Sequence, residues 1–271
     1  MPYWVKIILL GIVQGVTEFI PVSSSGHIVI FNEILGVELD EKALALNLLL
    51  HLGSLLAVIY FYRYKVWNLI KTAKRVITRS PDVKKEEKSF LFYIILAMIP
   101  TTIVGVFIRV SFGDYLFTST LVTGVCLIIT GTLLLITRFL STEHDTPLNS
   151  RRTFLIGLVQ GFAVLPGISR SGSTIAASMM QKINGKKAAE FSFMIFIPAL
   201  IGASLWEYIE YRDVIGDHFF QWTYLWGFLS SLISGFLALK LLLLVLVKEK
   251  LHIFSYYCFA AGILTLLYNL V

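Results

Sequence analysis

Six long apolar stretches constrain this chain more than any other feature of its sequence. They lie at about 43–62, 90–109, 115–140, 190–208, 222–247 and 252–271. Each approaches the ~20 helical residues needed to cross a hydrocarbon core of ~30 Å. Only 15% of the residues are charged, against about 25% in ordinary soluble domains. The sequence therefore predicts an all-α integral membrane protein with about six full transmembrane helices in a single membrane domain, 1–271.

The chain also contains an internal repeat. The segment GIVQGVTEFIPVSSSGH at 11–27 aligns with GLVQGFAVLPGISRSGS at 157–173, at a constant offset of 146. The glutamine–glycine pair and the serine-rich turn recur in both copies, and three apolar stretches follow each copy. Such self-similarity indicates a duplication. We expect repeat 1 over about 1–140 and repeat 2 over about 151–271.

Each copy of the repeat is interrupted by polar, turn-forming residues, so neither forms one comfortable span. Residues 4–20 and 27–36 flank the first interruption, and 154–166 and 173–183 flank the second. Broken helices persist at membrane depth only where protein or a wet cavity satisfies their backbone groups. We therefore expect two re-entrant helix hairpins. The three spans between them place the hairpins on opposite faces, which makes the repeat an inverted one.

The positive charges gather on one side of the expected spans. They cluster in a loop at 63–88 and again at 138–152, 182–187 and 248–250. If the spans alternate in direction, all four clusters share one face, which the positive-inside rule makes cytoplasmic. The acidic segment 207–221 and both termini then lie outside. The net charge of +6 thus reflects membrane topology, and we expect no nucleic-acid partner.

The first hairpin carries a carboxylate and a histidine within an apolar setting. Gln14 and Glu18 are four residues apart and share one helical face. An intramembrane carboxylate suggests a functional site, and a structural hydrogen bond is the alternative. Ser24 and His27 have an i, i+3 spacing, which would allow the imidazole to act as general base for the hydroxyl. A helix starting there would direct its positive end at an anion, with phosphate-binding candidates Gln14, Ser23, Ser25 and Gly26.

The second hairpin supplies an arginine. Arg170 lies among small polar residues, of which the candidates for phosphate binding are Ser169, Ser171, Gly172 and Thr174. Arginine suits bidentate contacts to phosphate and is costly to bury without an anion. A structural ion pair between Arg170 and Glu18 is the alternative, and the two interpretations can hold together if Glu18 binds Arg170 in the empty site.

Both motifs resemble a known family. QGVTEFIPVSSSGH and PGISRSGST, in this order and spacing, resemble the two signature regions of the bacterial undecaprenyl-diphosphate phosphatase family associated with bacitracin resistance, and the likeness extends over the whole chain. The resemblance implies catalytic roles for Glu18, Ser24, His27 and Arg170. Gln14 and Glu18 match its (E/Q)xxxE motif and are the candidate ligands of a divalent cation, Mg or Ca. Glutamine in place of the commoner glutamate makes Gln14 a weaker ligand.

The implied activity is hydrolysis of undecaprenyl diphosphate to undecaprenyl phosphate and inorganic phosphate, which recycles the lipid carrier for cell-wall synthesis. The implied location is the bacterial plasma membrane, with the site open to the outer side and bacitracin acting on the substrate rather than on the protein. Ser24 is the expected nucleophile, while attack by water or by His27 stays open. A lipid-carrier or anion transporter shares the same architecture and is the main alternative. Homodimer formation, prenyl chain length and lipid flipping are also open.

Overall fold

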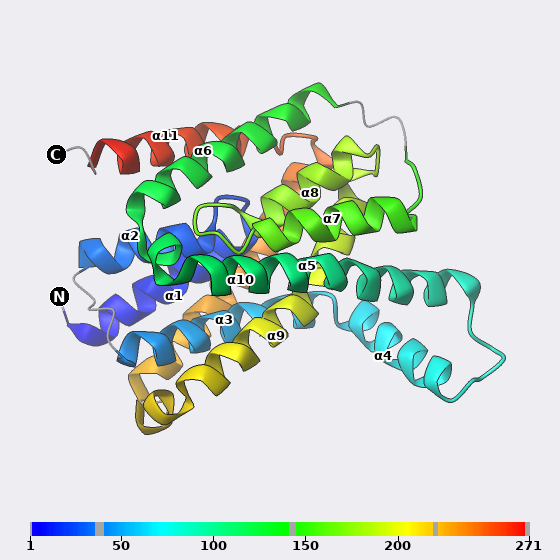
Figure 1. Ribbon diagram of the computed structural model, residues 1–271, viewed down its shortest axis with the longest axis horizontal. Helices are drawn as coiled ribbons and strands as arrows, with labels where there is room; N and C mark the ends of the chain where they lie inside the picture. The colour runs from blue at the N-terminus through cyan, green and yellow to red at the C-terminus, as the bar shows by residue number, and fades with distance from the viewer. Residues whose placement is uncertain (1, 36–40, 141–144, 219–221, 269–271) are drawn as a thin grey trace.

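The computed structural model describes residues 2–35, 41–140, 145–218 and 222–268, which fold into a bundle of helices (Figure 1). Hydrocarbon offers no partners for backbone N–H and C=O groups, and helices satisfy these groups internally. In chain order the helices are α1 (Tyr3–Phe19), α2 (Ser24–Leu35), α3 (Glu41–Phe61), α4 (Arg63–Ile77), α5 (Lys85–Thr118), α6 (Thr120–Ile136), η1 (Thr137–Phe139), α7 (Ser150–Phe162), α8 (Arg170–Met180), α9 (Gly185–His218), α10 (Trp222–Val247) and α11 (Ile253–Tyr268).

In the described ranges, each apolar stretch predicted from the sequence is mostly helical. Four segments are long and apolar enough to cross a membrane: Lys85–Phe112, Thr120–Phe139, Gly185–Glu210 and Trp222–Val247. Helices α3 and α4 together make a fifth candidate, bent by 84° between them. Helix α11 has 16 described residues, or about 24 Å at 1.5 Å per residue, so it is shorter than the other spans. The all-α membrane architecture is confirmed, with four to five candidate spans in the described chain.

The basic segment after the first span is a helix, α4, where we expected a loop. Thr72 is buried and donates a hydrogen bond to the Glu87 carboxylate at 3.3 Å, and the Asn68 amide donates to the same carboxylate at 3.2 Å. Lys65 forms an ion pair with Glu190 at 2.7 Å. These contacts hold α4 against the start of α5 and of α9. The loop prediction was wrong because it rested on the many basic residues and overlooked the helical spacing of the apolar residues between them.

The two hairpins are the helix pairs α1–α2 and α7–α8. The first helix of each hairpin packs against a span from the other half of the chain. Helix α1 crosses α10, and the crossing is close because glycines form it. A Cβ added at Gly11 would lie 2.4 Å from the Gly227 carbonyl oxygen, and one added at Gly15 would lie 2.3 Å from the Ser231 carbonyl oxygen. No side chain fits at either position without moving a backbone.

The second hairpin repeats this crossing. Helix α7 packs on α5, where a Cβ added at Gly157 would lie 2.2 Å from the Ala97 carbonyl oxygen. At Gly161 the added Cβ would meet the Pro100 carbonyl oxygen at 3.1 Å. Gly157 and Gly161 stand 146 residues after Gly11 and Gly15, which is the offset of the sequence repeat. The two copies of the motif are therefore used in the same way.

We expect Gly157→Ala to destabilise the protein and Gly202→Ala to leave it unchanged or slightly more stable. The first adds a methyl group against backbone, which typically costs about 1–3 kcal/mol. Gly202 also lies within a helix, but its added Cβ meets nothing within 4 Å, so alanine there gains helix propensity. Thermal unfolding in detergent should show a lower Tm for Gly157→Ala, by roughly 2–4 °C per kcal/mol. Equal Tm values for the two variants would contradict the close α7–α5 packing.

Candidate functional site

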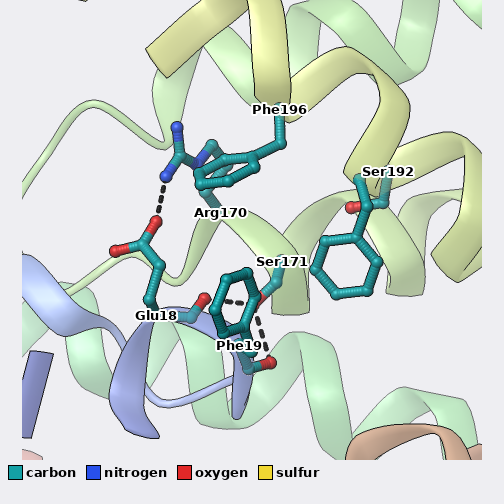
Figure 2. Close-up of a pocket in the computed structure, with 7 residues that line it drawn as sticks. Glu18, Phe19, Arg170, Ser171, Ser192 and Phe196 are labelled. Carbon is teal, nitrogen blue, oxygen red and sulfur yellow. Dashed lines mark hydrogen bonds and ion pairs between the residues drawn. The ribbon is translucent and has the colours of Figure 1, made fainter. Parts of the chain in front are cut away.

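The carboxylate of Glu18 is the point where the two hairpins meet. Its side chain is 3% exposed. One carboxylate oxygen, Oε1, forms an ion pair with Nη2 of Arg170, at the start of α8 (Figure 2). The other, Oε2, accepts hydrogen bonds from Ser24 Oγ at 2.5 Å and from Gln14 Nε2 at 2.9 Å. Three residues singled out from the sequence thus bind the carboxylate of a fourth, Glu18. Ser24 and Arg170 consequently lie within the roughly 8 Å that one phosphate could bridge.

Arg170 is held by an aromatic ring as well as by Glu18. Its guanidinium carbon lies 3.9 Å from the centroid of Phe196, a cation–π arrangement. Phe196 packs edge-on to Phe19, which also contacts Phe193 edge-on. A small pocket lies between these rings and the ion pair. In Figure 2 the guanidinium of Arg170 lies beside the ring of Phe196 and above the ring of Phe19. The charge is therefore fixed in position while 23% of the arginine side chain stays exposed.

Serine hydroxyls organise the turns that begin α2 and α8. Ser169 Oγ caps α8 by accepting from the Gly172 N–H at 3.1 Å. Ser23 Oγ accepts from the Gly26 N–H at 3.3 Å and also from the Gly167 N–H of the other hairpin at 3.0 Å. Ser23 has a φ of 71°, in the left-handed region that L-residues seldom adopt. The N–H groups of Gly26 and Gly172, expected to bind phosphate, are thus engaged with serines.

The last span of each half fastens the turn of the opposite hairpin. Thr130 on α6 donates to the Gly167 carbonyl at 2.8 Å and accepts from the Ser169 N–H at 3.0 Å. On α11, the Cys258 thiol lies 3.7 Å from the Pro21 carbonyl oxygen. Both connecting turns therefore receive polar contacts from buried side chains of these spans, which provides the partners that broken helices need at membrane depth.

The remaining hydroxyls expected to bind phosphate also have protein partners. Ser25 Oγ lies 3.3 Å from Ser23 Oγ. Ser171 Oγ donates to the last two carbonyls of α1, both at 3.4 Å. Thr174 Oγ1 lies 2.5 Å from Ser192 Oγ on α9. In this structure Ser171 and Thr174 join α8 to α1 and α9, and a role in phosphate binding stays an expectation for them.

His27 does not contact Ser24 in the way that the i, i+3 spacing predicts. Its Nδ1 lies 2.7 Å from the Ser23 carbonyl oxygen, and its Nε2 lies 2.6 Å from the hydroxyl of Tyr257 on α11. The Ser24 hydroxyl turns back instead toward Glu18. The reason is that Ser24 is the first residue of α2, where a short side chain can still reach the end of α1. Glu18, rather than His27, is placed to take a proton from Ser24.

The residues near Glu18 fit a divalent cation only in part. Within the described ranges, no three His, Cys, Asp or Glu side chains come together as a metal cluster. Glu18 provides one carboxylate, and Gln14 Oε1 is buried without a hydrogen-bond partner. Mg²⁺ commonly binds through one or two carboxylates plus substrate phosphates and water. The pair therefore suits a cation that takes most of its ligands from a bound phosphate, and it does not form a cage alone.

Two residues of the site were not found from the sequence. Phe196, under the guanidinium of Arg170, sits in an apolar stretch and reads as ordinary core. Tyr257, bonded to His27, lies in the last apolar stretch and reads as an aromatic residue of a membrane span. The sequence offers no signal for either, because their contacts join segments 26 and 230 residues apart.

Comparison with known proteins identifies the family of the chain. Proteins named undecaprenyl-diphosphatase from Alkaliphilus metalliredigens and Methanobrevibacter smithii are 39% and 40% identical to the chain. The alignments cover 98% and 96% of this chain, and 98% and 95% of those proteins. The protein of the same name from Korarchaeum cryptofilum is 38% identical over 94% of this chain and 95% of its own length. A family model described as bacitracin resistance protein BacA matches residues 7–264, and the chain belongs to that family.

Proposed function

We propose that this chain is a membrane-embedded phosphoric anhydride hydrolase that converts undecaprenyl diphosphate to undecaprenyl phosphate and inorganic phosphate. The names of its relatives support this substrate. The observation that carries the proposal is the shared carboxylate of Glu18, which binds a serine hydroxyl from one hairpin and a guanidinium from the other. A nucleophile and a phosphate-binding cation are thereby brought together in a buried setting. The activity would recycle the lipid carrier for cell-wall synthesis.

In the proposed mechanism, Ser24 Oγ attacks the terminal phosphorus and Glu18 takes the hydroxyl proton. The bond from that phosphorus to the bridging oxygen breaks, and undecaprenyl phosphate leaves. Water then attacks the phosphoserine, and Glu18 returns its proton to Ser24 Oγ as the bond between that oxygen and phosphorus breaks. Inorganic phosphate leaves with both hydrogens of the water. The guanidinium of Arg170 stabilises the negative charge on the transferring phosphoryl oxygens. The 2.5 Å contact between Ser24 and Glu18 supports this carboxylate as the base, in the role that we expected for His27.

A divalent cation, when bound, would neutralise part of the charge of the diphosphate. Glu18 and Gln14 are the protein groups that would hold it, through one carboxylate oxygen and the unpartnered Oε1 of Gln14. The side chains of this chain would still bind and orient the substrate without it, since Arg170 already supplies a fixed positive charge beside the nucleophile.

We further propose that the chain crosses the plasma membrane six times, with two re-entrant hairpins related by an inverted repeat. The reciprocal packing of α1 on α10 and α7 on α5 supports this symmetry, as do the matching glycines at both crossings. The basic residues of α4 would face the cytoplasm, and the acidic end of α9 would face outward. The substrate site would open to the outer side.

The first test compares Glu18→Gln with Glu190→Gln. Both remove the negative charge of an ion pair, but Glu190 is 38% exposed, pairs with Lys65 and does not line the pocket beside Arg170. We expect Glu18→Gln to lower kcat for phosphate release by on the order of 10²–10³, and Glu190→Gln to change it less than about twofold, as exposed pairs contribute little. Purified protein in detergent, checked for a monodisperse elution profile, is assayed with undecaprenyl diphosphate. Near-normal turnover of Glu18→Gln would remove Glu18 from the mechanism.

Ser24→Ala tests the nucleophile without leaving a charge unpaired. We expect kcat to fall at least as far as in Glu18→Gln, because the attacking oxygen is lost. Ser255→Ala is the control, since it removes a hydroxyl whose hydrogen bond goes to the His252 carbonyl and not to a residue of the site. Wild-type protein incubated with substrate labelled in its terminal phosphate should carry acid-stable phosphoserine. Full activity of Ser24→Ala would exclude serine attack and leave water or His27 as the nucleophile.

The orientation is tested by cysteine labelling in a background of Cys126→Ala and Cys258→Ala. Single cysteines replace Arg79, just after α4, and Asp213, near the end of α9. In intact cells an impermeant thiol reagent should label the cysteine at 213 and spare the one at 79. Permeabilised cells are the control, and both positions should label there. Labelling of the cysteine at 79 in intact cells, with the one at 213 spared, would reverse the proposed orientation.

A further inference from the structure

The contacts of His27 define which of its ring nitrogens carries a proton. The Ser23 carbonyl oxygen, 2.7 Å from Nδ1, can only accept a hydrogen bond, so Nδ1 carries the hydrogen. In a neutral imidazole Nε2 is then an acceptor. The hydroxyl of Tyr257 lies 2.6 Å from Nε2, and it therefore donates its hydrogen to His27. Both nitrogens of the ring are satisfied by the protein.

Two aromatic rings reinforce this placement. The ring of Tyr257 is nearly parallel to that of His27, with centroids 5.5 Å apart and planes 15° apart. Phe31, one turn along α2, lies 6.4 Å away with planes 24° apart. His27 itself is 3% exposed. The two hydrogen bonds and the two ring contacts thus fix the orientation of the imidazole.

His27 links Tyr257 to the turn that carries Ser24. His27 holds the carbonyl of Ser23, whose backbone has a strained φ of 71°. The hydroxyl of Ser23 binds the N–H of Gly167 in the opposite hairpin, and the next residue is Ser24. A shift of the imidazole would therefore move the hydroxyl that contacts Glu18.

The direction of the Tyr257 hydroxyl differs from that of a tyrosine that only anchors a span at the membrane surface. Tyrosines in membrane spans usually direct the hydroxyl toward headgroups and water, with the ring in the apolar region. Tyr257 is 48% exposed, yet its hydroxyl points to a buried histidine 230 residues earlier in the chain. Its neighbour Tyr256 is 56% exposed and serves as an internal comparison on the same helix.

We propose that Tyr257 is a positioning residue for the hydrolysis, which acts by holding His27 against the Ser23 turn. This inference rests on the proposed function of the chain. Tyr257 need not touch the substrate, so its loss should reduce the rate of the chemical step and leave substrate binding nearly unchanged.

The test uses Tyr257→Phe, which keeps the ring and removes the hydroxyl, with Tyr256→Phe as the matched control. We expect Tyr257→Phe to lower kcat for phosphate release from undecaprenyl diphosphate about 2- to 12-fold, the range for the loss of one hydrogen bond. KM and Tm should stay close to wild type, and Tyr256→Phe should match wild type throughout. In a His27→Gln background, adding Tyr257→Phe should change kcat by less than about twofold, because the two residues act as one unit. An unchanged kcat in Tyr257→Phe, or the same fold loss in both backgrounds, would overturn the proposal.

A spectroscopic readout keeps the test independent of activity. In protein labelled with ¹⁵N-histidine, the His27 signals are assigned by their loss in His27→Gln. We expect wild type to show a protonated Nδ1 and an acceptor Nε2, and Tyr257→Phe to shift the Nε2 signal while Tyr256→Phe does not. An inactive wild type with these signals would defeat the proposed function and leave the contact intact. Unchanged His27 signals in Tyr257→Phe would refute the contact itself.

Discussion

The ion pair between Glu18 and Arg170 joins the two hairpins, and the rest of the site depends on it. An isolated charge in a membrane interior is costly, and breaking a buried pair by removing one partner typically costs about 3–5 kcal/mol. Neither hairpin could hold its own charge in this setting without the other. Because the pair forms between residues 152 positions apart, it forms only when the two halves of the chain pack together.

The repeated motif supplies the scaffold, and the positions where its copies differ supply the chemistry. At the offset of 146, the matched residues include Gln14 and Gln160, the glycines of the helix crossings, and the serine caps Ser23 and Ser169. The unmatched positions include Ser24 and Arg170, each the first residue of its short helix. Glu18 corresponds to Val164 in the second copy. The repeated motif thus presents an asymmetric set of side chains, with the proposed nucleophile and base on one hairpin and the proposed phosphate-binding cation on the other.

The features that could be predicted are those that depend on residues near one another in the sequence. The lengths of the apolar stretches predicted the helices, and the internal repeat predicted both pairs of short helices. Glu18 and Arg170 stood out because charge is rare inside apolar segments, and their pairing followed from that cost. The partner of His27 was not predictable, because spacing along α2 allowed a contact with Ser24 and only the placement of α11 brings Tyr257 closer. Phe196 escaped notice for the same reason, since a phenylalanine in an apolar span has no local mark of a special role.

The geometry of Arg170 also explains how a diphosphate could enter a site whose charges are already paired. Arginine carries five N–H donors, and Nη2 makes the ion pair with Glu18. Its guanidinium rests on Phe196, which fixes its plane, while part of the side chain stays exposed. A phosphate oxygen could bind the remaining donors without displacing the carboxylate. Glu18 would then stay in contact with Ser24, so that binding of the substrate leaves the base and the nucleophile together. The ammonium group of a lysine at position 170 is a single point charge without this geometry. The planar guanidinium of arginine can instead donate to the Glu18 carboxylate and to a phosphate at the same time.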